Sequence, residues 1–511
     1  MNLGASDYTV LALLIPGLLL AWAAAIVIYR LAFHPLARFP GPKLAAITHL
    51  YEVYYDVWLG GQYTFKLREL HQRYGPVVRL NPDDLHFNDP EFYDDIFCVT
   101  SGKSEKPFKT ANAFGGYPAV IGTTDHDLHK LRRSALNPFF SKRSVNDICP
   151  FLIPIVGKFC SRLEEAAKKQ EHVNLKYAYA ALTMDNIAEY CFSKTPDRVL
   201  LPDFDKVGFD NIDSFIDTSL INIYFPWLLG WLYKIPENLL KRLLPALSGI
   251  VGAREALAHQ IEAIRDGQDH SFKTSGHRTI LHDLLESDLP KQEKSRNRLR
   301  DEAFSLVTAG SGTTAHTCKC TTYYIQADSG VYSKLMQELR TIMPTRETVP
   351  KLTDLEKLPY LTACVLEGLR LSHAVTHRAC RAFPYKTLEY KGQKIPPKTI
   401  VCSTALLLHE NPDTFPDPLI YRPERWLVSA AEKQRLQRHL VVFSRGARGC
   451  LGMNLAMAEL YLILAIVFRR FEFDIGKVQK GRDIDVDRDM IIAQPRKDSP
   501  GMIVKVNRIV E

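Results

Sequence analysis

A short glycine-rich stretch holds a cysteine in a setting suited to binding iron. Residues 443–452 read Phe-Ser-Arg-Gly-Ala-Arg-Gly-Cys-Leu-Gly, and an apolar run of helical character follows at 453–468. Glycines let the backbone approach the Cys450 sulfur closely and direct N–H groups at it. A helix that begins just after a cysteine also favours a thiolate at its N-terminus. The stretch therefore predicts a stabilised thiolate that could ligate a haem iron, and the alternative is a buried structural cysteine.

This pattern resembles the haem-ligand signature of the cytochrome P-450 superfamily, Phe-x-x-Gly-x-Arg-x-Cys-x-Gly, with every fixed position present. The resemblance implies that Cys450 ligates the iron of haem b. It also implies that Phe443, Gly446, Arg448 and Gly452 complete the cofactor-binding loop. The expected fold is the cytochrome P-450 fold, mainly α with minor β, behind a single N-terminal transmembrane helix.

A second motif lies in a long helix expected at about 298–326, where Ala-Gly-Ser-Gly-Thr-Thr spans 309–314. Two glycines inside a helix each cost roughly 1 kcal/mol relative to alanine, so they need a reason. In the family, small residues of such a helix open a groove for dioxygen beside a threonine that helps deliver protons. Gly310, Gly312 and Thr313 match these positions and are the candidates for catalysis, with helix packing as the alternative. The residue before the threonine is usually acidic in the family, so Gly312 leaves that part of the proton relay unfilled.

A third motif pairs charges across one helical turn. Glu367 and Arg370 are three residues apart, a spacing at which helical side chains are neighbours. In the family such a pair joins a later arginine in a buried network that supports the haem loop, and Arg425 matches that position. A surface ion pair is the alternative.

Basic residues elsewhere match positions that contact the haem propionates in the family. His129 and Arg133 lie one turn apart in an expected helix, and Arg381 and Arg448 match two further positions. Arginine suits a carboxylate because its planar fork donates two parallel hydrogen bonds. A solvated charged face is the alternative for the first pair.

The N-terminal region has the composition of a membrane anchor. Residues 8–29 contain no Asp, Glu, Lys or Arg, and as a helix they would extend about 33 Å, the thickness of a bilayer's hydrocarbon core. Basic residues follow this run and none precedes it, which predicts a lumenal N-terminus and a cytoplasmic catalytic domain at the endoplasmic reticulum. The expected organisation is an anchor at 1–32, a stiff, extended proline-rich hinge at 33–45 and a catalytic domain at 46–511. A cleaved signal peptide is the alternative.

Composition narrows the class of protein further. The chain has 511 residues, of which 46% are hydrophobic, and this is ample for a large core. Its net charge of +8 is spread along the sequence rather than gathered in a stripe, so no nucleic-acid partner is expected. Ten scattered cysteines show no zinc or disulfide-framework spacing, which indicates a reducing compartment.

Together the motifs resemble those of a membrane-anchored haem-thiolate monooxygenase, and the resemblance implies that it takes electrons from NADPH-cytochrome P-450 reductase, with cytochrome b5 as a second candidate donor. Residues 33–52 and 126–141 are similar to fungal trichodiene-oxygenase-type enzymes, which implies a lipophilic secondary metabolite (a terpenoid, polyketide or alkaloid) as substrate. Three alternatives remain open: an isomerase or dehydratase that needs no external electrons, a non-catalytic haem-binding protein, and an inactive scaffold within an enzyme complex.

Substrate contacts are expected from four segments: 108–123, 304–313, 374–380 and 491–494. The apolar segment 225–233, Phe-Pro-Trp-Leu-Leu-Gly-Trp-Leu-Tyr, has two interpretations: a second membrane contact, or ordinary core and cavity lining.

Overall fold

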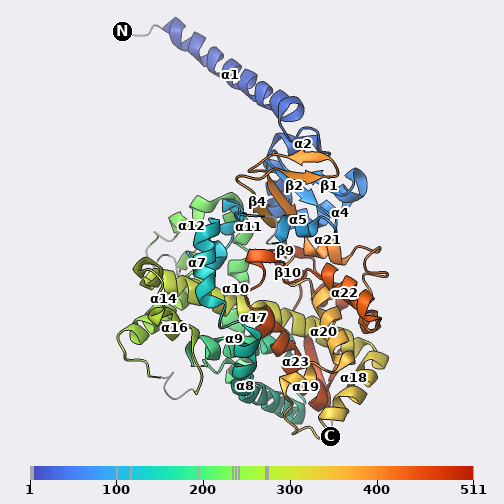
Figure 1. Cartoon of the computed structure of the whole chain (residues 1–511). Coiled ribbons are helices and arrows are strands. Elements are labelled where there is room, and N and C mark those ends of the chain that lie inside the picture. Colours follow the sequence, from blue (N-terminus) through green and yellow to red (C-terminus); the bar gives the residue numbers. More distant parts are fainter. Residues whose placement is uncertain are drawn as a thin grey trace.

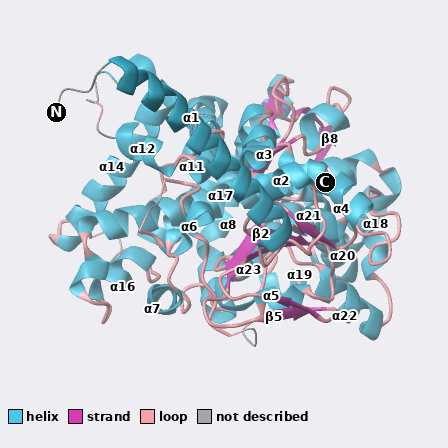
Figure 2. Cartoon of the chain, turned by 90° about the horizontal axis from the view of Figure 1, so that it is seen from above, coloured by secondary structure: helices cyan, strands magenta, loops and turns pink. Residues whose placement is uncertain are grey.

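The computed structural model describes residues 5–98, 102–115, 118–193, 195–232, 235, 239, 242–270 and 276–509. Helices make up most of the body, and the strands are short and few by comparison (Figures 1 and 2). The mainly helical fold with minor sheet that the sequence predicts is therefore confirmed.

The helices form an N-terminal set, which ends at residue 232, and a C-terminal set, which begins at residue 245. The first set is α1 (Ala5–Ile28), α2 (Lys43–Ile47), α3 (Leu50–Val53), α4 (Tyr63–Tyr74), α5 (Tyr93–Phe97), α6 (Phe108–Ala111), α7 (His126–Leu136), α8 (Lys142–Lys169), α9 (Leu175–Phe192), α10 (Lys206–Ile216), α11 (Ser219–Tyr224) and α12 (Pro226–Leu232). The second set is α14 (Pro245–Arg265), α16 (Ile280–Glu286), α17 (Arg296–Ala327), α18 (Ser329–Ile342), α19 (Leu352–Leu355), α20 (Pro359–Ser372), α21 (Ala405–His409), α22 (Ala430–His439) and α23 (Met453–Arg470).

The long helix α17 runs through the middle of the body and packs against α9, α14, α20 and α23 (Figure 1). The largest apolar cluster gathers around this set and includes side chains of α8 and α9. Because α17 is covered on several sides, a glycine or polar side chain on it faces either another helix or an internal cavity. The position of each residue on α17 therefore decides what it can do.

The strands form four small sheets around the helices. The strands are β1 (Val77–Arg79), β2 (Asp84–Phe87), β3 (His172–Asn174), β4 (Ala379–Ala382), β5 (Leu388–Tyr390), β6 (Gln393–Ile395), β7 (Ile400–Ser403), β8 (Phe471–Asp474), β9 (Arg488–Met490), β10 (Ile492–Gln494) and β11 (Ile503–Ile509). The orders are β1-β2-β7-β4, β3-β11-β8, β9-β10 and β5-β6, and β2–β7 is the one parallel pairing within these described strands. The four-stranded sheet places Arg381 and the β9-β10 hairpin places Gln494, and both residues matter below.

Helix α1 projects away from the body, with the N-terminus at its far end (Figure 1). Among the described residues, Leu14–Phe33 is the one helical stretch long and apolar enough to cross a membrane, and none of it is buried against the protein. Its composition and its exposure together support the N-terminal membrane anchor that the sequence predicts.

The proline-rich hinge differs from the extended lead that the sequence predicts. Tyr29–Phe33 continues the anchor as a π-helical turn, the following residues form turns, and α2 already begins at Lys43. Leu36 and Phe39 are buried in an apolar cluster with residues of β2 and β7. The three prolines exclude a regular α-helix here, but the two apolar side chains between them fasten the segment to the sheet.

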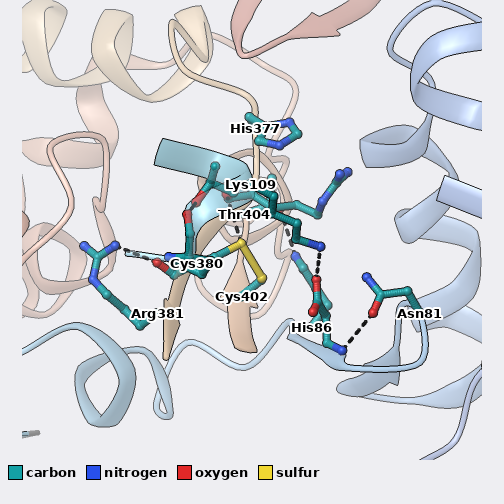
Figure 3. Close-up of a disulfide and its surroundings, with 12 residues drawn as sticks. Asn81, His86, Lys109, His377, Cys380, Arg381, Cys402 and Thr404 are labelled. Atoms are coloured by element: carbon teal, nitrogen blue, oxygen red, sulfur yellow. Dashed lines mark hydrogen bonds and ion pairs between the residues drawn. A yellow bond between two sulfur atoms is a disulfide. The ribbon is translucent and has the colours of Figure 1, made fainter. Parts of the chain in front are cut away.

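One pair of cysteines forms a disulfide that the sequence analysis did not predict. Cys380 on β4 and Cys402 on β7 form a disulfide, with their Cα atoms 4.2 Å apart (Figure 3). They lie directly opposite each other in an antiparallel pairing, where Cα atoms come closest at the non-hydrogen-bonded positions. Spacing along the chain does not reveal such a pair, because the contact depends on the register between two strands.

Candidate functional site

A cavity of about 380 Å³ lies between α17 and the cysteine loop. Phe114, Phe209, Phe215, Phe304 and Val375 form part of its mostly apolar wall, and the hairpin β9-β10 closes another side. Cys450 faces this cavity, and so do Gly312 and Thr313 of α17. Residues from all four segments expected to contact substrate line the same space, so the sequence correctly located much of its wall.

The loop around Cys450 has the backbone arrangement that its glycines allow. The Cys450 N–H donates to the Phe443 carbonyl at 2.7 Å, which closes the loop just before α23. Gly446 has a φ of +69°, and a Cβ there would overlap the carbonyl oxygen of Phe97. Glycine is therefore needed both for conformation and for close packing.

Two opposing effects act on the Cys450 thiol. Burial raises its pKa, whereas the backbone N–H of Gly452 and the charge of Arg133 lower it. Gly452 caps the N-terminus of α23, so its N–H is one of the donors that the first helical turn leaves free. These donors would stabilise a sulfur carrying the negative charge of an iron-bound thiolate.

The two glycines of α17 have different surroundings. A Cβ on Gly310 would lie 2.9 Å from Cγ1 of Ile187 on α9, so this glycine allows the two helices to pack closely. A Cβ on Gly312 would meet nothing within 4 Å, and Gly312 lines the cavity. The Thr313 hydroxyl donates to the Ala309 carbonyl at 2.9 Å, which leaves its lone pairs free to accept a hydrogen bond from the cavity side. Of the three candidates for catalysis, Gly312 and Thr313 thus face the cavity and Gly310 faces α9.

A cluster of basic side chains gathers near the cysteine loop. Arg448 donates to the carbonyls of Thr123 and Thr124 at 2.7 Å each. Arg133 donates to the Gly449 carbonyl at 2.6 Å, and Arg381 donates to the Cys380 carbonyl at 2.8 Å. Figure 3 shows Arg381 turned away from the neighbouring disulfide. His129 belongs to the same group, because the charges of the three arginines act on it. The four residues that the sequence predicts at the propionates therefore lie close to one another.

The electrostatics of this cluster show that its members repel one another. Burial, followed by the charges of Arg448, Arg133 and Arg381, lowers the pKa of His129 to about 3. Burial also lowers the pKa of Arg381 to about 10 and, with the charge of Arg381, that of Arg448 to about 10. Buried cations of one sign are costly unless an anion joins them.

Lys106 is a fifth member that the sequence analysis missed. Its ammonium donates to the Ile121 carbonyl at 2.8 Å, and burial together with Arg448 and Arg381 lowers its pKa to about 7. No acidic side chain forms an ion pair with Lys106, Arg381 or Arg448 in the described part of the chain. The only sequence signal was a lysine before Pro107, which carries no information about burial.

The residues present fit a haem. A thiol faces the cavity, and the basic cluster would receive the two carboxylates of the porphyrin. The apolar walls between α17 and the cysteine loop suit its hydrophobic ring. The excess of positive charge is the deciding observation, because Asp125 and Glu105 act on Arg448 only at a distance and form no ion pair with it among the described residues.

Below the loop, Glu367 is the centre of a fully buried network. Arg370 donates to both of its carboxylate oxygens, at 2.7 and 3.0 Å, and Arg425 donates at 3.3 Å. The indole N–H of Trp426 adds a bond at 2.9 Å. Arg370 also donates to carbonyls of the 409–420 region, so the network holds three segments together. The structure thus brings together the three residues that the sequence assigned to support of the loop.

Comparison with known protein families identifies the family to which this chain belongs. The family model "Cytochrome P450" matches residues 40–500. The chain belongs to the cytochrome P450 family. It is 39% identical to cytochrome P450 monooxygenase MO6277 of Ascocoryne sarcoides over 98% of this chain and 99% of that protein. It is 39% identical to monooxygenase tpcC of Cochliobolus heterostrophus, covering 94% of each chain. It is 33% identical to monooxygenase TRI4 of Trichoderma arundinaceum, covering 92% of this chain and 90% of that protein.

Membership of the cytochrome P450 family makes this chain a haem-thiolate monooxygenase, as the motifs predicted. Its cofactor is haem with a cysteine thiolate ligand. When bound, the haem supplies the activation of dioxygen and the transfer of one oxygen atom. The family also implies a redox partner and a lipophilic substrate, which the largely apolar cavity suits.

Proposed function

We propose that this cytochrome P450 inserts one oxygen atom from O2 into a lipophilic secondary metabolite, such as a terpenoid, polyketide or alkaloid, during fungal natural-product biosynthesis. The observation that carries the proposal is one cavity bounded by Cys450 on one side and by Gly312 and Thr313 on the other. Cofactor ligand, oxygen-binding groove and substrate space are thus parts of a single enclosure. An apolar enclosure of this kind excludes water and positions a hydrophobic substrate.

Each residue has a proposed role in this enclosure. Cys450 would ligate the iron through its thiolate, and the N–H of Gly452 would moderate the charge on its sulfur. Lys106, His129, Arg133, Arg381 and Arg448 hold the porphyrin carboxylates. The Thr313 hydroxyl holds a proton or a water molecule at the mouth of the groove that Gly312 keeps open. Because position 312 carries no acid, water in this groove has to bring the protons.

The proposed redox partner is NADPH-cytochrome P-450 reductase, with cytochrome b5 as a second donor. Arg445 of the cysteine loop is a weak candidate for a reductase contact, because it already pairs with Asp94 and stacks on Tyr93. Other basic residues on the surface around the cysteine loop would have to attract an acidic reductase.

The proposed location is the endoplasmic reticulum membrane, with a lumenal N-terminus and a cytoplasmic catalytic domain. The segment 225–233 supports a second membrane contact. Trp227 and Trp231 on α12 are 64% and 71% exposed, and Trp58 is 82% exposed, so none of the three side chains belongs to the core. Tyr233 lies outside the described residues. Tryptophan favours the interface between lipid and water. A protein without residues 1–32 should still bind vesicles, and its Trp227→Ser/Trp231→Ser variant should not.

A two-step experiment tests the proposed function. A strain that lacks the gene should accumulate a precursor, and microsomes containing the protein should convert that precursor only with NADPH and O2. The reduced, CO-bound spectrum should show the thiolate band. Turnover without reductase and NADPH would favour an isomerase or dehydratase, and absence of the thiolate band would contradict the haem-thiolate assignment.

A further inference from the structure

One face of α17 continues along the cavity beyond the oxygen groove. Ser305, Thr308, Gly312, His316 and Lys319 line the cavity, and their spacing of three or four residues places them on one face of the helix. Lys319 lies six residues past Thr313, which is roughly 9 Å further along the helix axis. Lys319 is only 4% exposed. A lysine therefore stands at the end of the cavity remote from the groove.

The ammonium of Lys319 has little to neutralise it. Its nearest hydrogen-bond acceptor is the backbone carbonyl of Asp483, at 3.3 Å. The carboxylate of Asp483 is occupied by Arg482 and Ser499, at 2.7 to 2.9 Å. No ion pair joins Lys319 to an acidic side chain among the residues that the structure describes. An ammonium has three donors, so this one retains unused hydrogen-bonding capacity.

Nearby charges do not neutralise the ammonium of Lys319. Lys176 on α9 pairs with Asp213 on α10 at 2.7 Å, so these two residues at the same end of the cavity largely cancel each other. Burial lowers the pKa of Lys319 below its ordinary value, and Lys176 contributes in the same direction, whereas Cys320, Asp213 and Asp483 oppose it. A buried cation without an anion is destabilising for the protein, and a ligand that supplies the anion would relieve the cost.

We propose that Lys319 is a substrate-binding residue that anchors a carboxylate of the substrate at the far end of the cavity. The substrate would then be a lipophilic carboxylic acid whose carbon skeleton lies along α17, with the carbon to be oxidised near Thr313. Gln494 also lines the cavity, and its side-chain amide is a hydrogen-bond donor for such an anion, whereas the Ser499 hydroxyl already donates to Asp483. This inference rests on the proposed function and narrows its substrate class from lipophilic metabolites in general to acids.

Chain-length probes that fix one end at the iron can test this proposal without knowledge of the natural substrate. Imidazolyl-octanoic, imidazolyl-decanoic and imidazolyl-dodecanoic acids carry an imidazole that ligates a haem iron at one end and a carboxylate at the other. The corresponding imidazolyl alcohols are the neutral controls. Titration of the haem-loaded protein, followed by the shift of the Soret band, gives the Kd of each probe. The imidazole contribution cancels within each acid and alcohol pair.

The wild-type protein should bind the acid about tenfold or more tightly than the alcohol at one preferred chain length, because a buried charge-assisted hydrogen bond replaces a neutral one. Lys319→Met should abolish this preference and leave the affinity for the alcohol within about twofold. Lys319→Arg should retain much of the preference. Lys334→Met, which changes a surface lysine paired with Glu424, is the matched control and should behave like the wild type.

Three results would overturn the inference. The first is equal binding of acid and alcohol by the wild type at every length. The second is an acid preference that survives Lys319→Met. The third is a preference that Lys176→Met removes and Lys319→Met does not. If Lys319→Met shows no CO-bound thiolate band, Lys319→Gln takes its place. The comparison of acid and alcohol binding by the wild type tests the proposal independently of any variant. Absence of a Soret band from the wild type would instead contradict the proposed function itself, so the two failures are distinguishable.

Discussion

Asn186 on α9 donates a hydrogen bond to Oε1 of Glu459 on α23 at 2.9 Å, and both side chains are almost completely buried. The bond joins two helices that both pack against α17. Burial raises the pKa of Glu459 to about 8, although hydrogen bonds from Asn186 and Thr314 act against this shift. The carboxyl group is therefore neutral at physiological pH. It lies within hydrogen-bonding distance of Thr314, the residue after Thr313.

The raised pKa of Glu459 makes stability depend on pH. The folded protein holds this proton more tightly than the unfolded chain, whose glutamate has a pKa near 4.5. The contribution is complete below about pH 4.5 and is lost as the pH rises towards 8, at up to about 1.4 kcal/mol per pH unit. Glu459→Gln should flatten the dependence of thermal stability on pH between 5 and 8, as measured by calorimetry. Glu389→Gln, at an exposed position of β5, should not, and an unchanged slope in Glu459→Gln would contradict the assignment.

The buried pair Glu367–Arg370 should be far more sensitive than an exposed pair of the same spacing. Arg370→Ala leaves a buried carboxylate with only part of its network, which should cost about 3–5 kcal/mol of unfolding free energy and release the haem. The matched control is Arg435→Ala, because Glu432 and Arg435 are also three apart on a helix but exposed. That change should leave the thiolate band and the unfolding midpoint nearly unaltered. Equal effects of the two substitutions would refute the supporting role.

Much of the site could be predicted because its motifs are local. The helix expected at 298–326 is observed as Arg296–Ala327, since its periodicity lies within one stretch of sequence. Glu367 and Arg370 are likewise neighbours on one helix. Contacts of this kind follow from helical geometry alone.

What could not be predicted depends on contacts between distant segments. The Cys380–Cys402 disulfide follows from the register of β4 on β7, and the lowered pKa of Lys106 follows from the approach of Arg381 and Arg448, which are distant in the sequence. The hinge around Phe39 appeared extended because its prolines exclude a helix, yet its two apolar side chains anchor it to the sheet. Local propensity gives the allowed conformations, and tertiary packing selects among them.

The two glycines of α17 should respond differently to alanine. Gly310→Ala places a methyl group 2.9 Å from Cγ1 of Ile187, so it should lower the melting temperature, and the loss should be smaller in an Ile187→Ala background, which lacks that atom. Gly312→Ala meets nothing within 4 Å and lies in a helix, so its melting temperature should be equal or higher. Its effect should appear instead in the coupling of NADPH consumption to product, because the added methyl group narrows the groove. The reverse pattern of melting temperatures would contradict the packing described for α17.

Lys106 should control how tightly the haem is held. Lys106→Met removes one of the cations near the cysteine loop, so haem transfer to apomyoglobin should become several-fold faster. Lys103→Met removes a surface lysine paired with Asp127 and should leave the rate unchanged. A carboxylate beside Lys106 favours its charged form, so haem binding should take up a proton once the pH exceeds the free protein's pKa of about 7. Haem affinity should therefore fall between pH 6 and 8 in the wild type and fall less steeply in Lys106→Met, and identical pH profiles would show that Lys106 does not meet a propionate.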